Sequence, residues 1–235
     1  MPPPFEPAEL ESGDLELLGL LPAASNYTFL ARLHTEGEPA FVVYKPRRGE
    51  APLWDFPSGT LCQREVAAYL VCRAAGWGFV PPTVLRDGPH GPGAVQAFIP
   101  HDFTTTAFDL LAERPEVVQG IVLFDIAVNN ADRKAGHVFT DEEGAVWAVD
   151  HGICFHEEPK LRTVLWDFTG RPIPPAERAP LELLCRALEG DLAAELEPLL
   201  TPAELHALRR RTEAIAGAAC FPEPGQGRPY PWPPV

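Results

Sequence analysis

The sequence predicts an α+β protein with two lobes: a small antiparallel sheet with one helix, followed by a mainly helical lobe. Two observations support this prediction. Residues 13–101 carry short runs of β-branched, aromatic and aliphatic residues between turns rich in proline, glycine and polar residues, which is typical of strands. Residues 102–220 change to helical periodicity. We expect the two lobes to be joined by a hinge near residues 100–102.

Both ends of the chain differ from the lobes in composition. Residues 1–12 begin with an acidic, proline-rich stretch, and residues 221–235 contain six prolines. We expect both to be extended tails that are loosely attached to the rest. The N-terminus lacks the basic and apolar character of a signal peptide, and no run approaches the roughly 18 apolar residues that span a membrane. A soluble cytoplasmic protein without stable membrane association is therefore expected.

The first lobe is expected to contain a small antiparallel sheet of residues 15–20, 27–34 and 41–44, and a further hairpin of residues 83–86 and 94–99 that leads to the hinge. A helix is expected at residues 61–75, between the third and fourth strands, because apolar residues recur there at helical spacing. Thr60 and Gln63 have the spacing of a capping box at its start, and Gly76 follows its last residue.

The second lobe is expected to begin with a mostly apolar helix at residues 116–128, which leads directly into the polar loop of residues 129–137. A short hairpin and three further helices follow, at residues 137–140, 145–149, 176–189, 192–199 and 202–219. Thr201 and Pro202 mark the start of the last helix.

Composition limits the possible functions. A chain of 235 residues with 46% hydrophobic residues can bury a substantial core. Its formal charge of −14 argues against binding to nucleic acid or to an anionic membrane surface. The five cysteines are odd in number and include no Cys-x-x-Cys pair, so neither a disulfide framework nor a zinc knuckle is indicated.

Lysine is rare in this chain: Lys45, Lys134 and Lys160 are the only three, beside 16 arginines. Lys45 ends an apolar strand, so its compact charge could reach nucleotide phosphates from the sheet. Glu65, on the helix twenty residues later, could hold that ammonium in place. Taken alone, the pair could equally be a strand-end lysine and a surface glutamate with no role in binding. A second group of residues further along the chain, which includes Asp132 and Asp150, favours the functional interpretation.

Asp132 lies in the polar loop, and Asp150 ends a strand eighteen residues later. The following His151-Gly152 pair lets the backbone turn, so that both carboxylates can face one cleft. One carboxylate could accept the proton of a substrate hydroxyl, while the other holds the divalent metal that bridges the phosphates of ATP. His137 is placed to supply a further metal ligand.

Four segments together resemble the phosphatidylinositol 3-/4-kinase-like branch of the protein-kinase-like fold, which includes the HipA-type bacterial kinases. They are Lys45 in Val-Tyr-Lys-Pro, Glu65 in Gln-Arg-Glu-Val-Ala, Asp132 in Asn-Ala-Asp-Arg-Lys-Ala-Gly-His, and Asp150 in Val-Asp-His-Gly. The resemblance covers about residues 15–200. It implies that Lys45 binds the phosphates of ATP and that Glu65 pairs with it.

The same resemblance implies that Asp132 is the catalytic acid or base, that Arg133 supports its loop, and that Asp150 holds Mg²⁺. His137 stands where the family usually has asparagine or another oxygen ligand. Because imidazole is a softer ligand, Mn²⁺ could replace Mg²⁺.

The phosphate-binding loop implied by the resemblance is residues 21–27, which contain no glycine. Ser25 and the backbone N–H groups of Asn26 and Tyr27 would then contact the phosphates.

We therefore expect an ATP-dependent enzyme that transfers the γ-phosphoryl group to a hydroxyl. The acceptor is expected to be a protein or a small molecule rather than an inositol lipid, because residues 156–162 are short and mixed in charge. Two alternatives remain: an AMP-transferring enzyme on the same fold, and a pseudokinase or nucleotide-binding interaction module. His137 and the glycine-poor loop favour the second alternative, and the four charged residues count against it.

Overall fold

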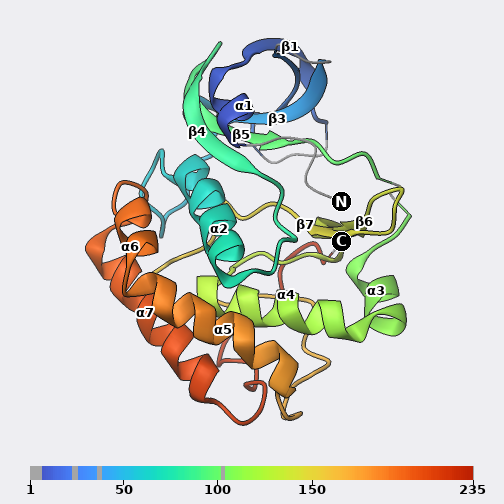
Figure 1. Ribbon diagram of the computed structural model, residues 1–235, viewed down its shortest axis with the longest axis vertical. Coiled ribbons are helices and arrows are strands. Elements are labelled where there is room, and N and C mark those ends of the chain that lie inside the picture. Colours follow the sequence, from blue (N-terminus) through green and yellow to red (C-terminus); the bar gives the residue numbers. More distant parts are fainter. Residues whose placement is uncertain (1–6, 23–25, 36–38, 102–103, 235) are drawn as a thin grey trace.

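The computed structural model describes residues 7–22, 26–35, 39–101 and 104–234. A five-stranded antiparallel sheet forms one lobe and a group of helices forms the other (Figure 1). The strands are ordered along the sheet as β1 (Asp14–Leu20), β2 (Phe29–His34), β3 (Ala40–Pro46), β5 (Gly91–Ala97) and β4 (Thr83–Gly88). The expected α+β fold with two lobes is confirmed.

Helices cover both faces of the sheet. Leu10, on α1 (Pro7–Ser12), packs with alternate strand residues such as Leu33 and Val42 on one face. Cys62 and Val66, on α2 (Leu61–Ala75), pack on the other face. The prediction of an extended tail through residue 12 is therefore wrong for α1, and the described part of the first lobe has two α-helices rather than one. Burial of Leu10 and hydrogen bonds from Arg86 to the carbonyls of Leu10 and Gly13 hold α1 in place.

Helix α2 has the predicted bounds, and Gly76 ends it in the left-handed conformation at φ 77°. The predicted capping box is wrong. Thr60 has helical φ and ψ angles and donates its hydroxyl to the Pro57 carbonyl, so it does not cap the helix. Instead Glu50, which follows β3, accepts the backbone N–H of Cys62 at 2.8 Å. A side chain outside the helix thus satisfies one of its free N–H groups.

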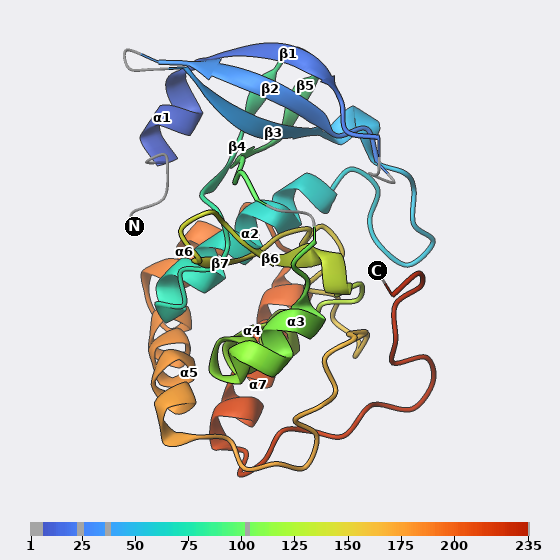
Figure 2. The same cartoon turned by 90° about the vertical axis from the view of Figure 1, so that its right-hand side faces the viewer.

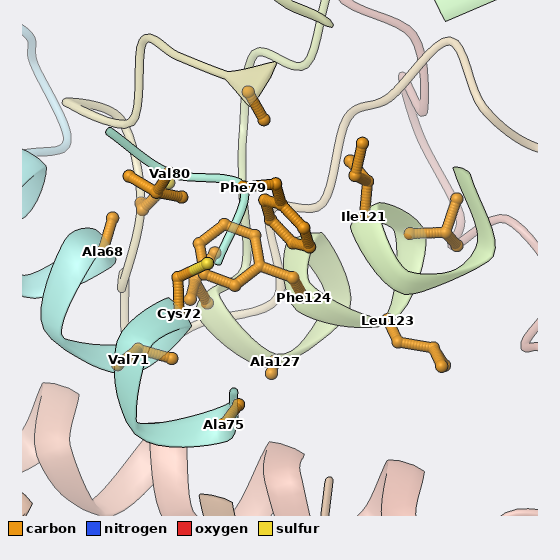
Figure 3. Packing of buried hydrophobic residues seen from close by; sticks show 14 of the residues in the cluster. Ala68, Val71, Cys72, Ala75, Phe79, Val80, Ile121, Leu123, Phe124 and Ala127 are labelled. Atoms are coloured by element: carbon orange, nitrogen blue, oxygen red, sulfur yellow. The ribbon is translucent and has the colours of Figure 1, made fainter. Parts of the chain in front are cut away.

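The second lobe is built on α4 (Pro115–Val128), most of whose residues are buried. Figure 3 shows that its Phe124 packs against α2 at Cys72 and against Phe79. The remaining helices around this core are α3 (Ala107–Glu113), α5 (Pro175–Leu188), α6 (Asp191–Leu196) and α7 (Pro202–Gly217). Helix α3 was not predicted, although Thr106 and Asp109 form a capping box at its start.

A short hairpin of β6 (Val138–Thr140) and β7 (Val146–Ala148) lies between the two lobes. Its Phe139 and Trp147 pack with Ile99, which lies between β5 and α3. Helix α2 also joins the lobes, since Arg64 forms a buried ion pair with Glu204 of α7 and donates to the Cys154 carbonyl at 2.6 Å.

The C-terminal residues 221–234 form no helix or strand, as expected, but they are not loosely attached. Figure 2 shows this segment running along one side of the helical lobe. Phe221 is buried, the Pro229 carbonyl accepts the backbone N–H of Thr163 at 3.0 Å, and the Pro234 carbonyl accepts that of Ala135 at 2.9 Å. The prediction of loose attachment is therefore wrong for the described part of this tail. Among the residues that the structure describes, no helix is both long enough and apolar enough to cross a membrane.

Candidate active site

The polar loop begins where α4 ends. Asn129 adopts the left-handed conformation at φ 56°. Its amide donates to the carbonyls of His156 and Glu158 at 2.9 and 2.7 Å, and its Oδ1 accepts the N–H of Lys160 at 2.8 Å. One asparagine thus ties the loop to the segment that follows Asp150.

Arg133 holds the loop from inside the protein. Its guanidinium is fully buried and forms a two-point ion pair with Asp125 of α4, at 2.9 and 3.0 Å. It also donates to the Val149 carbonyl at 2.9 Å, and lies 2.7 Å from Nε2 of His151. Because Val149 and His151 flank Asp150, Arg133 fixes the positions of Asp132 and Asp150 relative to each other.

His151 is buried, and its pKa lies well below the usual value because of that burial and of the neighbouring Arg133 charge. The imidazole is therefore neutral, and its Nε2 accepts from Arg133. The backbone N–H of His151 donates to Glu65 Oε2 at 3.1 Å, which links α2 to the Asp150 turn.

Lys45 of β3 and Glu65 of α2 form an ion pair that connects the sheet to the helix, as expected from the sequence. The Lys45 ammonium also lies 3.3 Å from Oδ1 of Asp150. Burial would lower the pKa of Lys45, but the charges of Glu65 and Asp150 more than offset it and raise the pKa above its usual value. Lys45 is therefore positively charged at any physiological pH.

Asp150 adopts a left-handed backbone conformation at φ 63°, which is uncommon for a residue other than glycine. Its Oδ2 lies 3.4 Å from Nε2 of His137. Desolvation raises the pKa of Asp150, but the charge of Lys45 more than offsets it and holds the pKa well below its usual range. Burial lowers the pKa of His137 to about 4, so its imidazole is neutral at pH 7.

Asp132 points into the same cavity, with a quarter of its side chain exposed. Its Oδ2 lies 3.0 Å from the ammonium of Lys134, and its backbone N–H donates to Asn130 Oδ1 at 3.0 Å. Partial burial raises the pKa of Asp132, although Lys134 opposes that rise.

The cavity has a volume of about 140 Å³, and the structure brings six of the eight predicted site residues to it. These are Asn26, Lys45, Glu65, Asp132, His137 and Asp150. Arg133 lies behind the loop and does not line the cavity. Ser25 lies outside the described residues.

The expected phosphate contact of the Tyr27 backbone N–H is wrong, while that of the Asn26 backbone N–H stays a prediction. The N–H of Tyr27 donates to the Gly49 carbonyl at 3.0 Å, so it is not available to a phosphate. Asn26 Oδ1 accepts the N–H of Ala51 at 2.7 Å. Both residues therefore link the segment before β2 to the segment after β3. The sequence of the loop alone does not indicate these contacts, because their partners lie more than 20 residues away.

A second, mainly apolar cavity of about 410 Å³ adjoins the first and shares Thr28, Lys45, His137 and Asp150 with it. Val43, Ile99 and Phe139 contribute to its walls.

Gln96 is a buried polar residue in this cavity wall. Its Nε2 donates to Thr83 Oγ1 at 2.8 Å, and that hydroxyl donates to the Pro81 carbonyl at 2.8 Å. The carboxamide is therefore fixed, and its Oε1 accepts no hydrogen bond from the part of the chain that the structure describes.

The side chains of the first cavity include oxygen and nitrogen donors of the kind that bind divalent metals. The described residues contain no group of three or more His, Cys, Asp and Glu side chains arranged to hold an ion. Asp150 and His137 nevertheless provide an ionised carboxylate and a neutral imidazole. Magnesium and manganese sites on nucleotides need few protein ligands, because phosphates and water complete the coordination. The two residues fit such an ion.

Sequence reasoning missed the groups that support this site. Asp125 could have been found, since it is the only charged residue in the apolar stretch of residues 117–128. Lys134 carried a signal too, because lysine is rare in this chain. The roles of Asn129 and Glu50 depend on contacts between distant segments, and nothing in their local sequence indicates them.

Solved structures with a similar arrangement define the class of fold as protein-kinase-like. The Golgi casein kinase matches with a TM-score of 0.51 at 15% identity, covering 89% of this chain and 73% of that one. A Helicobacter pylori proinflammatory kinase, CtkA, matches at 0.51 and 10% identity, covering 89% and 94%. The hydra Fam20 structure with sugar matches at 0.53 and 16% identity, covering 88% and 85%.

Sequence comparison identifies the family. Protein Rv2133c of Mycobacterium tuberculosis is 40% identical over 263 aligned positions, which cover 97% of this chain and 95% of that protein. The chain therefore belongs to the same family as Protein Rv2133c.

A more distant relative is phosphatidylinositol 4-kinase gamma 4 of Oryza sativa subsp. japonica, which is 30% identical over 122 positions. That match covers 44% of this chain and 22% of the plant protein, so it does not establish membership of the phosphatidylinositol kinase branch. No family model matches the chain.

Proposed function

We propose that the protein is an ATP-dependent phosphotransferase that moves the γ-phosphoryl group to a hydroxyl of its acceptor. One observation supports this most: Asp132 and Asp150 line the same cavity as the Lys45–Glu65 pair. Kinases with the same fold add support, and one Golgi casein kinase structure contains manganese and ADP.

In this proposal the nucleotide base occupies the apolar cavity, and the phosphates lie at Lys45. Oε1 of Gln96 would accept a hydrogen bond from the exocyclic amine of adenine, a group that guanine lacks at the corresponding position. Glu65 holds the Lys45 ammonium in place for the phosphates.

Asp150 and His137 would hold a divalent metal, which neutralises charge on the phosphates when it is bound. Manganese suits this pair because a neutral imidazole is a softer ligand than an oxygen group. Asp132 would orient the acceptor hydroxyl. As the hydroxyl oxygen bonds to the γ-phosphorus and the bond to the bridging oxygen breaks, Asp132 accepts the proton and ADP leaves.

We place the nucleotide-binding lobe at residues 13–101 and the catalytic lobe at residues 102–220. A distant place in the phosphatidylinositol 3-/4-kinase-like branch fits the motifs and the partial plant match. The acceptor is proposed to be a protein or a small molecule rather than an inositol lipid, because residues 156–162 have a mixed charge.

The test is the shift in melting temperature (Tm) caused by ATP with Mn²⁺ or Mg²⁺, compared between wild type and Asp150→Asn. A ligand that binds only the folded state raises Tm. We expect a metal-dependent rise that the variant loses. If neither metal produces a shift, the proposal is wrong and the interaction module is favoured. The mass added to a modified acceptor then distinguishes phosphoryl transfer from AMP transfer.

A further inference from the structure

A cavity of about 350 Å³ lies between the segment after Asp150 and the C-terminal tail. Residues 159–162 and Trp166 form one wall, and tail residues between 222 and 229 form the other. It shares no lining residue with the two cavities described above. The proposed nucleotide site does not use it.

Arg162 is held directly against the loop that carries Asp132. Its backbone N–H donates to the Asn130 carbonyl at 2.9 Å, and its own carbonyl accepts the N–H of Arg133 at 3.0 Å. These two partners flank Asp132 in the sequence. The charge of Arg162 is also near enough to lower the pKa of Asp132, in part against the larger effect of burial.

The tail is fixed to the same segment. Thr163 N–H and Trp166 Nε1 both donate to the Pro229 carbonyl, at 3.0 and 3.2 Å. Arg228, the residue before Pro229, therefore lines the same cavity as Arg162. The two arginines come from segments more than 60 residues apart in the sequence, and the tertiary structure brings them together.

The cations of this cavity differ in whether they are neutralised. Lys160 forms an ion pair with Asp55 at 2.9 Å, and both side chains are largely buried. The side chains of Arg162 and Arg228 form no hydrogen bond or ion pair within the described parts of the chain. Glu223 is the one carboxylate among the lining residues, and it forms no ion pair with either arginine.

Among the described residues, Arg32, Arg64, Arg73 and Arg133 form ion pairs with carboxylates, and Arg162 and Arg228 are among the arginines that do not. Two unpaired guanidinium groups at one cavity leave a local positive charge beside Asp132. The planar guanidinium fork matches the oxygens of a phosphate group in charge and geometry.

We propose that this cavity binds a phosphate group on the acceptor through Arg162 and Arg228. The acceptor is then a small phosphate monoester with a free hydroxyl, and two arginines balance its double negative charge. This inference rests on the proposed function only for the role of Asp132 toward that hydroxyl. The bound phosphate itself takes no part in the reaction, in which the acceptor hydroxyl alone becomes phosphorylated.

The binding test uses the full chain without nucleotide, with inorganic phosphate and glycerol 3-phosphate as probes in isothermal titration calorimetry. Loss of one charged hydrogen-bonding partner should weaken binding of both probes about tenfold or more. We expect this loss in Arg162→Gln and in Arg228→Gln. The control is Arg186→Gln, which removes the same charge from an exposed site on α5, across the helical lobe from the tail (Figure 2).

Arg228 is exposed, so its replacement removes no core contact, and this variant decides the test even if Arg162→Gln fails to fold. Equal affinity in wild type, Arg228→Gln and Arg186→Gln would overturn the proposal. So would phosphate binding that is lost in Lys45→Ala and kept in Arg228→Gln, because the phosphate would then occupy the nucleotide site.

Phosphate binding without nucleotide separates this inference from the proposed function. If Arg228-dependent binding is found but ATP causes no shift in Tm, the cavity remains a phosphate site and the phosphotransferase proposal fails. If phosphoryl transfer occurs with the same KM for a phosphorylated acceptor in wild type and Arg228→Gln, the cavity is not the acceptor site. Tighter binding of glycerol 3-phosphate than of inorganic phosphate would indicate a monoester ligand, and the reverse order would overturn the acceptor assignment.

Discussion

Arg133 shows how one side chain can position several others. Its guanidinium contacts Asp125 of α4 and, on the segment around Asp150, the Val149 carbonyl and His151. An unpaired buried charge is costly, so all these partners are needed together. Asp132 can consequently face the cavity in a fixed position, although it makes few contacts of its own.

The first prediction concerns Asp132. Asp132→Asn keeps the shape of the side chain but cannot accept a proton, so turnover should fall about 10²- to 10⁴-fold. The Tm should stay close to that of wild type, because the side chain is partly exposed. Phosphoryl transfer and thermal unfolding measure the two effects. Asp167→Asn, at an exposed position, is the control, and wild-type turnover in Asp132→Asn would contradict the assigned role.

The second prediction concerns stability at low pH. The pKa of His151 lies well below its usual value in the folded state, and that of His137 is about 4. The unfolded chain binds protons at these imidazoles near pH 6.5. Between these values the unfolded state holds more protons, so the free energy of unfolding falls as pH drops below about 6.5. The fall approaches about 1.4 kcal/mol per pH unit for each imidazole.

Urea unfolding at several pH values between about 5 and about 7.5 measures this slope. This range lies on both sides of the usual histidine pKa of about 6.5. His151→Gln removes one titrating group while its amide oxygen can still accept from Arg133. The pH dependence should become shallower in this variant by about one proton. An unchanged slope would show that His151 is not held neutral in the folded state.

At the scale of elements, α2 connects the sheet to the helical lobe. One side of α2 packs on the sheet through Cys62 and Val66, and another packs on α4 through Cys72 (Figure 3). The helix is therefore buried on most sides, and Glu65 is carried between the lobes on a rigid element. Its pairing with Lys45 depends on this packing.

The third prediction tests that packing. Phe124→Ala should lower the free energy of unfolding by about 3–5 kcal/mol, because it leaves a cavity between α4, α2 and Phe79. Denaturant unfolding measures the loss. Phe108→Ala on α3 is the matched control, since Phe108 is 46% exposed and its loss should change stability by much less. Equal losses in the two variants would argue against the observed core.

At the scale of the whole molecule, the net charge of −14 favours expansion through self-repulsion. The fourth prediction is that Tm rises when ionic strength increases from about 0.01 M to about 0.1 M, which shortens the screening length from about 30 Å to about 10 Å. Differential scanning calorimetry measures this. Near the isoelectric point of about 4.9 the rise should disappear. A fall in Tm at neutral pH would mean that local ion pairs outweigh the net repulsion.

Much of the fold could be predicted because local patterns determine where elements lie. The bounds of α2 followed from apolar periodicity and Gly76, and the start of α7 followed from Thr201 and Pro202. Lys45, Asp132 and Asp150 could be identified as candidates because each lies near the end of a predicted strand or helix. Such features depend on residues close together in the sequence.

Only the tertiary structure decided the features that depend on distant segments. Glu50, not Thr60, accepts a free N–H at the start of α2. Burial of Leu10 stabilises a helix in the segment that was expected to be an extended tail. The Pro229 carbonyl binds the N–H of Thr163 and so holds the C-terminal residues on the segment after Asp150. The Arg162 and Arg228 cavity belongs to the same group. The physical reason is that burial and hydrogen bonding between segments outweigh the local preference for helix, strand or loop. The sequence of one segment does not indicate which distant segment it will contact.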